Sequence, residues 1–413
     1  MDPTTYTDPQ LTLQDRLVID ALVNEPASSS EARSEQLKLS QKLYDMNDAS
    51  HSTFDPTVFQ LWDNTLLRDR LPAPIHRYVL QPYQKWAQGV VRFPTDVVML
   101  THLILYFTTL VPSAIYLYYN FSWWRGVLHW AMQLFYCGAF TLMKHQHIHM
   151  GGVLMPQYWL FDTLFPYLLD PLHGHTWNSY FYHHIKHHHV EGNGALDLST
   201  TMFYDRDSAA DFACYLGRFF FLIWAELPRY FWSKGQKKYA CKVAFWELGN
   251  YLAIYLLYNY VNARATVFVL ILPLTVMRIG LMVGNWGQHA FVDPSDPDSD
   301  WLSSITLIDV PSNRFSFNDG YHTSHHLNPR RHWRDHPASF IKQKDRYAEE
   351  RALVFRNVDY IFITVNLLRK NYIHLAKCLI PIGDQVNMTL EERAEMLRTR
   401  TRRFRHADPK KNS

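Results

Sequence analysis

The sequence predicts an all-α integral membrane protein, with four transmembrane helices in two hairpins and a cytosolic helical cap that carries most of the histidines. Three observations lead to this fold class. Four segments stay apolar over about 20 residues, which is the length of helix that crosses a bilayer. Aromatic residues make up 15% of the 413-residue chain, as expected for a protein with a lipid-facing belt. Finally, many of the 22 histidines gather close to the ends of the apolar segments.

The apolar segments pair into hairpins because the connection within each pair is short. Residues 120–125 join the first pair and residues 262–264 join the second, which leaves room only for antiparallel helices. Each connection holds one arginine, whereas most lysines and arginines lie in the other polar segments. By the positive-inside rule, those segments and both termini should face the cytosol. The spans are expected at 97–119, 126–143, 243–261 and 265–284.

The chain should divide into three regions, of which the middle one holds the spans and the histidine groups. We expect a polar cytosolic N-terminal region at 1–94, the membrane region at 95–340 and a cytosolic helical C-terminal region with a basic tail at 341–413. The N-terminal region lacks the basic start and short apolar core of a signal peptide. The segments 153–172 and 211–232 are apolar but interrupted by proline and charged residues, so we expect helices that lie in the interface or re-enter it.

The C-terminal region carries two weaker signals. Thr389 and Glu392 have the spacing of a capping box, which predicts that a helix begins there and runs into the basic tail. Lys410 and Lys411 resemble a dilysine signal for retrieval to the endoplasmic reticulum. The alternative is a solvated basic tail that lies near anionic lipid.

Charge and cysteine usage exclude several classes of protein. The formal net charge of +3 is too small to indicate nucleic-acid binding, so nucleic acid is not an expected partner. The four cysteines show no C-x-x-C spacing, which argues against a disulfide framework and against a zinc knuckle. A protein that faces the reducing cytosol is the natural interpretation.

Four histidine groups carry the predicted chemistry. Each group contains residues spaced three or four apart, so an α-helix would turn its members to one face, and the topology brings all four groups to one side of the membrane. Imidazole nitrogens bind iron, zinc, copper or nickel, so the ligand type does not fix the metal. Nine of them exceed the three or four that a single zinc takes, which indicates two metals with open positions in the helical cap. The groups are His145 and His149; His184, His187 and His188; Asn285 and His289; and His322, His325 and His326.

These patterns, H-x-x-x-H, H-x-x-H-H, N-x-x-x-H and H-x-x-H-H, resemble the histidine boxes of the membrane fatty acid desaturase family. The resemblance covers roughly residues 97–333, and the segment 318–329 is close to the third box of that family. It implies two Fe²⁺ ions held by the nine histidines, with Asn285 acting through a water molecule, and O2 as co-substrate. The first box has three residues between its histidines instead of the four of acyl-CoA desaturases, which favours an acyl-lipid, sphingolipid or specialised substrate.

The same resemblance implies that electrons come from an external donor, namely cytochrome b5 and its reductase. A fused cytochrome b5 domain would carry a His-Pro-Gly-Gly motif, and His336-Pro337-Ala338-Ser339 is not one. We therefore expect a desaturase of the endoplasmic reticulum membrane that introduces a double bond into a fatty acyl or related lipid chain. No residue specifies its oligomeric state.

Several alternatives share part of this pattern. A lipid hydroxylase, epoxygenase, acetylenase or carotenoid ketolase would carry the same boxes. A zinc-dependent membrane hydrolase would need neither O2 nor a reductant, a metal transporter would place its ligands in mid-membrane, and an inactive binding homologue would not need all ten positions. Asn193, Asp197 and Asp319 either orient ligand imidazoles or are turn residues. The isolated His147, His173 and His175 are expected to be hydrogen-bonded histidines and not ligands.

Overall fold

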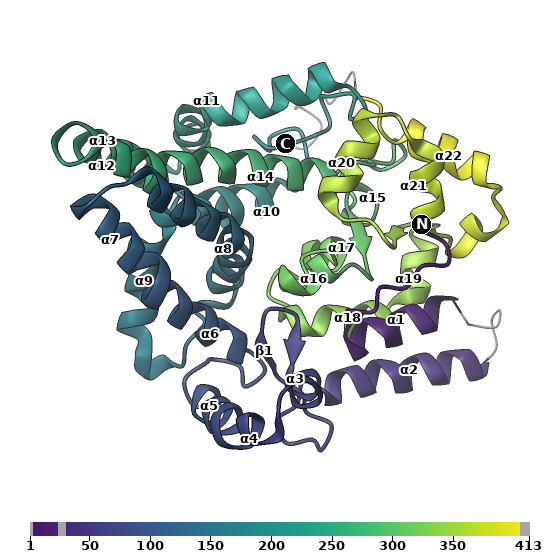
Figure 1. Ribbon diagram of the computed structural model, residues 1–413. Coiled ribbons are helices and arrows are strands. Elements are labelled where there is room, and N and C mark those ends of the chain that lie inside the picture. Colours follow the sequence, from purple (N-terminus) through teal and green to yellow (C-terminus); the bar gives the residue numbers. More distant parts are fainter. Residues whose placement is uncertain (1–2, 24–29, 405–413) are drawn as a thin grey trace. The chain divides into compact units, whose positions relative to one another are not determined.

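The computed structural model describes residues 3–23 and 30–404, and Figure 1 shows its elements. Lys410 and Lys411, on which the retrieval signal depends, lie outside the described residues. The contacts between residues divide the chain into two interleaved units. We call residues 1–82, 191–215 and 283–413 the mixed unit, and residues 83–190 and 216–282 the helical unit. The predicted region boundaries at 94 and 340 stay a prediction.

The helical unit contains the apolar segments. Four elements, α5, α10, α11 and α14, begin in one unit and end in the other. The elements are α5 (Gln81–Gln88), α6 (Val97–Leu105), η2 (Tyr106–Leu110), α7 (Val111–Tyr119), α8 (Trp123–Met150), η3 (Pro156–Tyr158), α9 (Trp159–Leu172), η4 (Phe181–His188), α10 (His189–Glu191), α11 (Ala209–Ser233), α12 (Lys237–Tyr260), α13 (Ala263–Thr266), η5 (Val267–Ile271) and α14 (Leu272–Gln288).

Two continuous helical stretches in the described residues are long and apolar enough to cross a bilayer. They are Val97–Tyr119, made of α6, η2 and α7, and Ala263–Gln288, made of α13, η5 and α14. Both cover spans that the sequence predicts. The other two expected spans fall on α8 and α12, which are helical but are not among the stretches apolar enough to cross a bilayer. The arrangement of four spans in two hairpins therefore stays a prediction.

The mixed unit is built from short helices and two small sheets. Its elements are α1 (Leu13–Val23), α2 (Ser30–Asp45), β1 (Thr57–Phe59), β2 (Trp62–Asp63), α3 (Asn64–Arg70), α4 (Ala73–Ile75), η1 (His76–Leu80), α15 (Asp300–Ser303), β3 (Ile305–Leu307), α16 (Pro311–Phe315), α17 (His322–Leu327), η6 (Trp333–Asp335), α18 (His336–Lys342), α19 (Lys344–Glu349), β4 (Leu353–Phe355), α20 (Tyr360–Leu368), α21 (Tyr372–Cys378), β5 (Leu379–Ile380), η7 (Gly383–Asn387) and α22 (Leu390–Thr399).

The sheets correct the expectation of an all-α fold, although the protein is mostly helical. Strands β1 and β2 form an antiparallel pair, and β4 lies between β3, which runs parallel to it, and β5, which runs antiparallel. Strands β3 and β4 have three residues each and are buried along their whole length. Because they are short and have no exposed face, they do not show the alternating pattern of a half-buried strand. Around them pack α20, α21 and α22, and the predicted capping box of Thr389 and Glu392 at the start of α22 is confirmed.

Three of the π-helical segments have a proline as their cause. A proline has no N–H for the carbonyl four residues before it, and its ring collides with that carbonyl in an α-helix. Widening one turn to the π form relieves the collision. In each case the proline lies two residues beyond the end of the π segment, so that the affected carbonyl falls within it. The three pairs are η1 with Pro82, η2 with Pro112 and η5 with Pro273.

A buried glutamine holds three elements of the helical unit together. Gln133 on α8 donates from Nε2 to the carbonyl of Leu172 at 2.8 Å and to the carbonyl of Val269 at 2.9 Å. Val269 is four residues before Pro273, so its carbonyl lacks the N–H donor that any other residue at position 273 would provide. A buried amide that donates twice satisfies two backbone carbonyls that lipid could not.

Candidate metal centre

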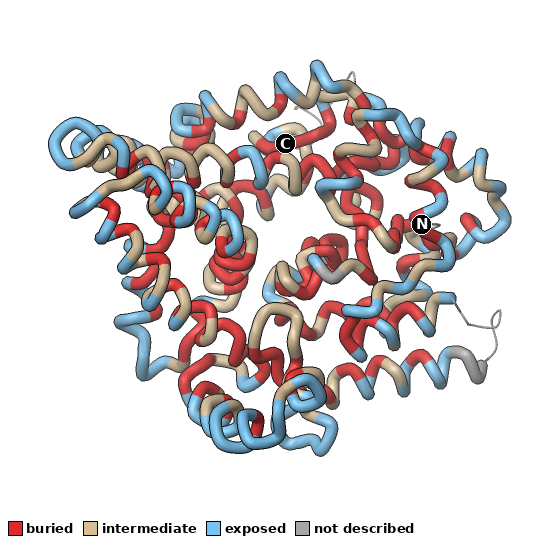
Figure 2. The backbone as a smooth tube through the Cα atoms, viewed as in Figure 1, coloured by how far each residue is buried: buried red, intermediate tan, exposed pale blue. Residues whose placement is uncertain are grey.

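The mixed unit brings three of the predicted ligands together. His289 follows the end of α14, whereas His322 and His326 lie one turn apart on α17, whose residues 322–326 are buried (Figure 2). Nε2 of His322 is 3.2 Å from Nε2 of His289 and 3.1 Å from Nε2 of His326. We call these three residues the mixed-unit set. Two nitrogens that are each roughly 2.1 Å from one metal ion, at right angles, would be about 3.0 Å apart, which is close to this spacing.

Neighbouring oxygen atoms fix the protonation of two rings in the mixed-unit set. Nδ1 of His289 is 2.7 Å from the carbonyl oxygen of Ser303, and Nδ1 of His326 is 3.2 Å from Oδ1 of Asp300. Because these oxygens can only accept, both Nδ1 atoms carry a proton, and in the neutral rings both Nε2 atoms present lone pairs. Carbonyl and carboxylate groups hold metal-binding histidines in this way.

The contacts of His322 provide a test of whether a metal ion fits. A neutral imidazole has one N–H, so Nε2 of His322 can donate to the lone pair of His289 or to that of His326, but not to both. In at least one of the two contacts, lone pairs would therefore face each other at close range. A cation bound by all three nitrogens removes this repulsion, so the donor set fits a metal ion better than it fits hydrogen bonds alone.

The helical unit assembles a second group from the first two boxes. His145 and His149 lie at the end of α8, His184 lies on η4 and His189 begins α10, and one nitrogen of each lies within 4.8 Å of the others. Nε2 of His184 is 3.0 Å from Nε2 of His189. The ring of His145 is 4.6 Å from those of His149 and His184, measured between centroids. We call these four residues the helical-unit set.

Burial favours the metal-binding form of His184. Removal from water, together with the neighbouring His189 and His145, holds the pKa of His184 well below its usual value. The ring is therefore neutral, which is the form in which imidazole binds metals.

The other predicted ligands lie beside these sets. The ring of His188 stacks on that of His184 at 5.6 Å, and the ring of His325 is 6.1 Å from that of His322. His187 packs on Tyr230, with ring centroids 4.4 Å apart, and contributes no nitrogen to the helical-unit set.

Asn285 is held by its amide. Its Nδ2 donates to the carbonyl of Ser199 at 2.8 Å and to the hydroxyl of Tyr215 at 2.7 Å. These two bonds use both protons of the amide nitrogen, so Oδ1 is the atom that remains for a bridging water.

The three polar residues proposed to orient ligands all lie close to them in the mixed unit. Asn193 exchanges hydrogen bonds with Thr201, whose hydroxyl donates to the carbonyl of His289 at 2.8 Å. Asp197 accepts from the backbone N–H and the hydroxyl of Ser199. Their role in holding ligands stays a prediction.

Asp319, the third of these residues, accepts a hydrogen bond of 2.8 Å from Gln288, the residue before His289. Burial raises the pKa of Asp319 to about 7, although the bond from Gln288 opposes this rise.

The isolated histidines are hydrogen-bonded, as expected. His147 lies 2.9 Å from the carbonyl of Asp162, His173 lies 2.8 Å from that of Leu169, and His175 lies 3.0 Å from the hydroxyl of Thr141. None of the three belongs to either histidine set.

His189 is a site residue that the histidine pattern of the sequence does not predict. The expectation that residues 184–188 form an α-helix is wrong, because η4 is a π-helix whose turn is one residue wider. The only signal in the sequence is the run of three consecutive histidines at 187–189, which does not show which of them join the set.

Comparison with known proteins agrees with this geometry. The family model described as fatty acid desaturase matches residues 122–356, more than half of the chain, and this range includes every histidine of both sets. Searches of curated proteins and of solved structures found no match. The members of this family are membrane-associated oxidoreductases, and the two histidine sets are compatible with a dimetal centre. The chain belongs to the fatty acid desaturase family.

Proposed function

We propose that this protein is an O2-dependent desaturase that introduces a double bond into the acyl chain of a lipid at a pair of iron ions. The observation that supports this most is the close approach of imidazole nitrogens within each unit, 3.0 Å in the helical-unit set and 3.1 and 3.2 Å in the mixed-unit set. Seven histidines in two sets are more than one ion needs, which favours a pair of metals over a single zinc.

The reaction requires a redox cofactor because an unactivated methylene group has no polar handle for acid or base catalysis. Iron, when bound, supplies the reductive activation of dioxygen. The overall change removes two hydrogens from adjacent carbons and consumes one O2, two electrons and two protons to form two waters. The chain orients the imidazoles, through contacts such as those of Ser303 and Asp300, and keeps five of the seven buried.

We further propose that electrons come from an external donor, cytochrome b5 with its reductase, and that the enzyme lies in the endoplasmic reticulum membrane with both termini in the cytosol. Membership of a membrane-associated family and the two apolar helical stretches support a membrane location. The distribution of lysine and arginine along the chain supports the orientation.

Product analysis tests the proposed reaction. Cells that express the protein and receive defined acyl lipids should accumulate a product that has lost two hydrogens, and this product should disappear without O2. A product that gains one oxygen and no double bond would instead identify a hydroxylase. Purified protein that contains zinc and no iron would support a hydrolase and contradict the proposal.

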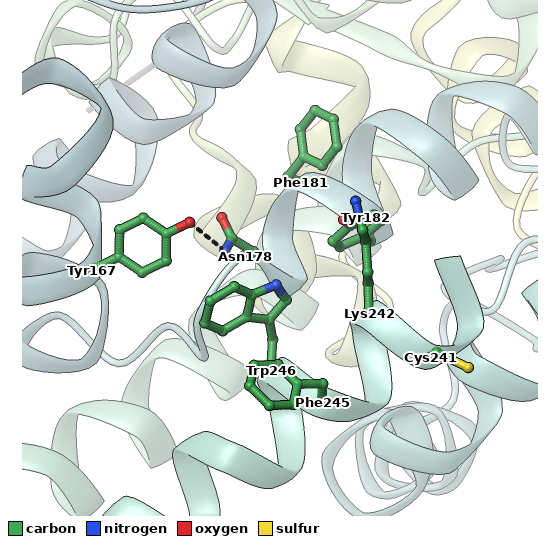
Figure 3. A pocket seen from close by; sticks show the side chains of 8 residues that line it. All are labelled: Tyr167, Asn178, Phe181, Tyr182, Cys241, Lys242, Phe245 and Trp246. Carbon is green, nitrogen blue, oxygen red and sulfur yellow. Dashed lines mark hydrogen bonds between the residues drawn. The ribbon is translucent and has the colours of Figure 1, made fainter. Parts of the chain in front are cut away.

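A pocket of about 580 Å³ in the helical unit supports an amphiphilic substrate. Figure 3 shows aromatic side chains from α9, η4 and α12 around it. This volume lies within the range of small-molecule sites, and aromatic walls suit an acyl chain. Lys242 is the one charged residue among those that line it, so we propose that the substrate carries an anionic headgroup. The rings belong to Tyr167, Phe181, Tyr182, Phe245 and Trp246.

Neutralising Lys242 tests this headgroup. The Lys242→Gln variant should raise KM for an anionic acyl lipid about fivefold, since an exposed ion pair contributes about 1 kcal/mol, and should leave kcat unchanged. Lys238→Gln is the matched control, because Lys238 is an exposed lysine on the same helix that does not line the pocket. Equal KM values for all three proteins would rule out this role.

A further inference from the structure

The second histidine box is π-helical without a proline to cause it. The three π segments described above each precede a proline by two residues, whereas residues 181–227 contain none. The π segment η4 is also longer, with eight residues against five in each of the other three. π-turns are rare and frequently lie at functional sites, so η4 needs a reason other than a proline.

The wide turn decides which histidines share a face. The backbone N–H of His189 donates to the carbonyl of His184, five residues earlier, so His189 lies one π-turn beyond His184. Their rings are 4.5 Å apart between centroids, and the ring of His189 is also 4.8 Å from that of His149. In an α-helix, His187 and His188 would take this position beside His184 instead.

The same turn carries His187 away from the first box. Its ring packs on Tyr230 and lies 5.4 Å from the ring of His183, and these two histidines belong to a separate group of possible ligands, apart from the helical-unit set. Both His187 and His189 are adjacent to His188 in the sequence, so only the helical geometry distinguishes them.

We propose that His189, and not His187, is the metal ligand that completes the set of His145, His149 and His184. The second box of this chain is thus read over a π-turn, as H-x-x-x-x-H between His184 and His189. This inference rests on the proposed function only in that the helical-unit set holds iron. The π-turn has a role in this arrangement, because it brings two nitrogens of one segment to the 3.0 Å spacing of neighbouring ligands.

Iron content of purified full-length protein tests the assignment without relying on activity. His189→Ala should lower the iron bound per protein from about two to about one, because the helical-unit set loses a ligand and the mixed-unit set is unchanged. His187→Ala is the matched control, since it removes the same side chain two residues away, and it should keep the iron content of the unaltered protein. Iron is measured by mass spectrometry of the metal, and thermal unfolding is measured on each variant.

Each variant can overturn the proposal independently. Loss of iron from His187→Ala, or full iron in His189→Ala, contradicts it. If His189→Ala does not fold, the result for His187→Ala still decides whether His187 is a ligand, and His189→Asp, which keeps a donor atom, should fold and retain more iron than His189→Ala. Failure of desaturation with the predicted iron pattern would reject the proposed reaction and leave this assignment standing.

Discussion

Replacement of His322 by alanine should abolish turnover and remove iron from the mixed-unit set. Its Nε2 lies between those of His289 and His326, at 3.2 and 3.1 Å, so it is the central ligand of the three. Loss of a group that only orients a ligand costs about 10–100-fold in affinity or activity, and loss of the ligand itself should cost more. Turnover is measured as double bonds formed, and iron as atoms bound per protein.

His51→Ala provides the control for this experiment. His51 is in the same unit, its side chain is 43% exposed, and it belongs to neither histidine set. The control should match the unaltered protein in iron and in turnover. Desaturation at an undiminished rate in His322→Ala would exclude the mixed-unit set as part of the active centre.

The Asp63→Ala variant should be less stable by about 3–5 kcal/mol, because Asp63 is the anion between two buried arginines. Its carboxylate accepts from Arg314 at 2.7 and 2.9 Å and from Arg334 at 3.0 Å. The side chains of Arg314 and Arg334 are only 1% and 0% exposed, so neither can recover its hydration when the carboxylate is removed. The two arginines flank the third histidine box in the sequence, so we expect the histidines of the mixed-unit set to be held less rigidly in this variant as well. Stability is measured by unfolding in detergent.

An exposed pair of the same chemistry is the control for Asp63. The side chains of Arg68 and Asp69 are 58% and 64% exposed, so Asp69→Ala should change stability by less than about 1 kcal/mol. Equal stabilities of the Asp63 and Asp69 variants would show that the buried network contributes little.

The contribution of Asp63 to the stability of the protein also depends on pH, because only the ionised carboxylate pairs with the two arginines. Burial alone would raise the pKa of Asp63, but Arg314 and Arg334 beside it hold that pKa below 3.8. Its contribution to stability is therefore fully present at neutral pH, and it is lost only as the pH falls through the pKa of the folded state.

The sequence predicted the parts of the molecule that depend on local pattern. Long apolar runs located the helices at 97–119 and 265–284, because helix formation and apolar composition are both read from consecutive residues. The pair His145 and His149 was found for the same reason, since four residues make one turn of the α-helix to which it belongs. The sheets were missed because strands of two or three residues carry no detectable period.

The second histidine box shows where local pattern stops being sufficient. By itself, the sequence determined that this chain carries clustered imidazoles beside apolar helices, which is enough to indicate a metal enzyme of a membrane. Only the tertiary structure decided that His189 faces His145 and His149 and that His187 faces Tyr230. The physical reason is that a π-turn and an α-turn differ by one residue per hydrogen bond, so the same run of residues turns different histidines to one face in the two forms.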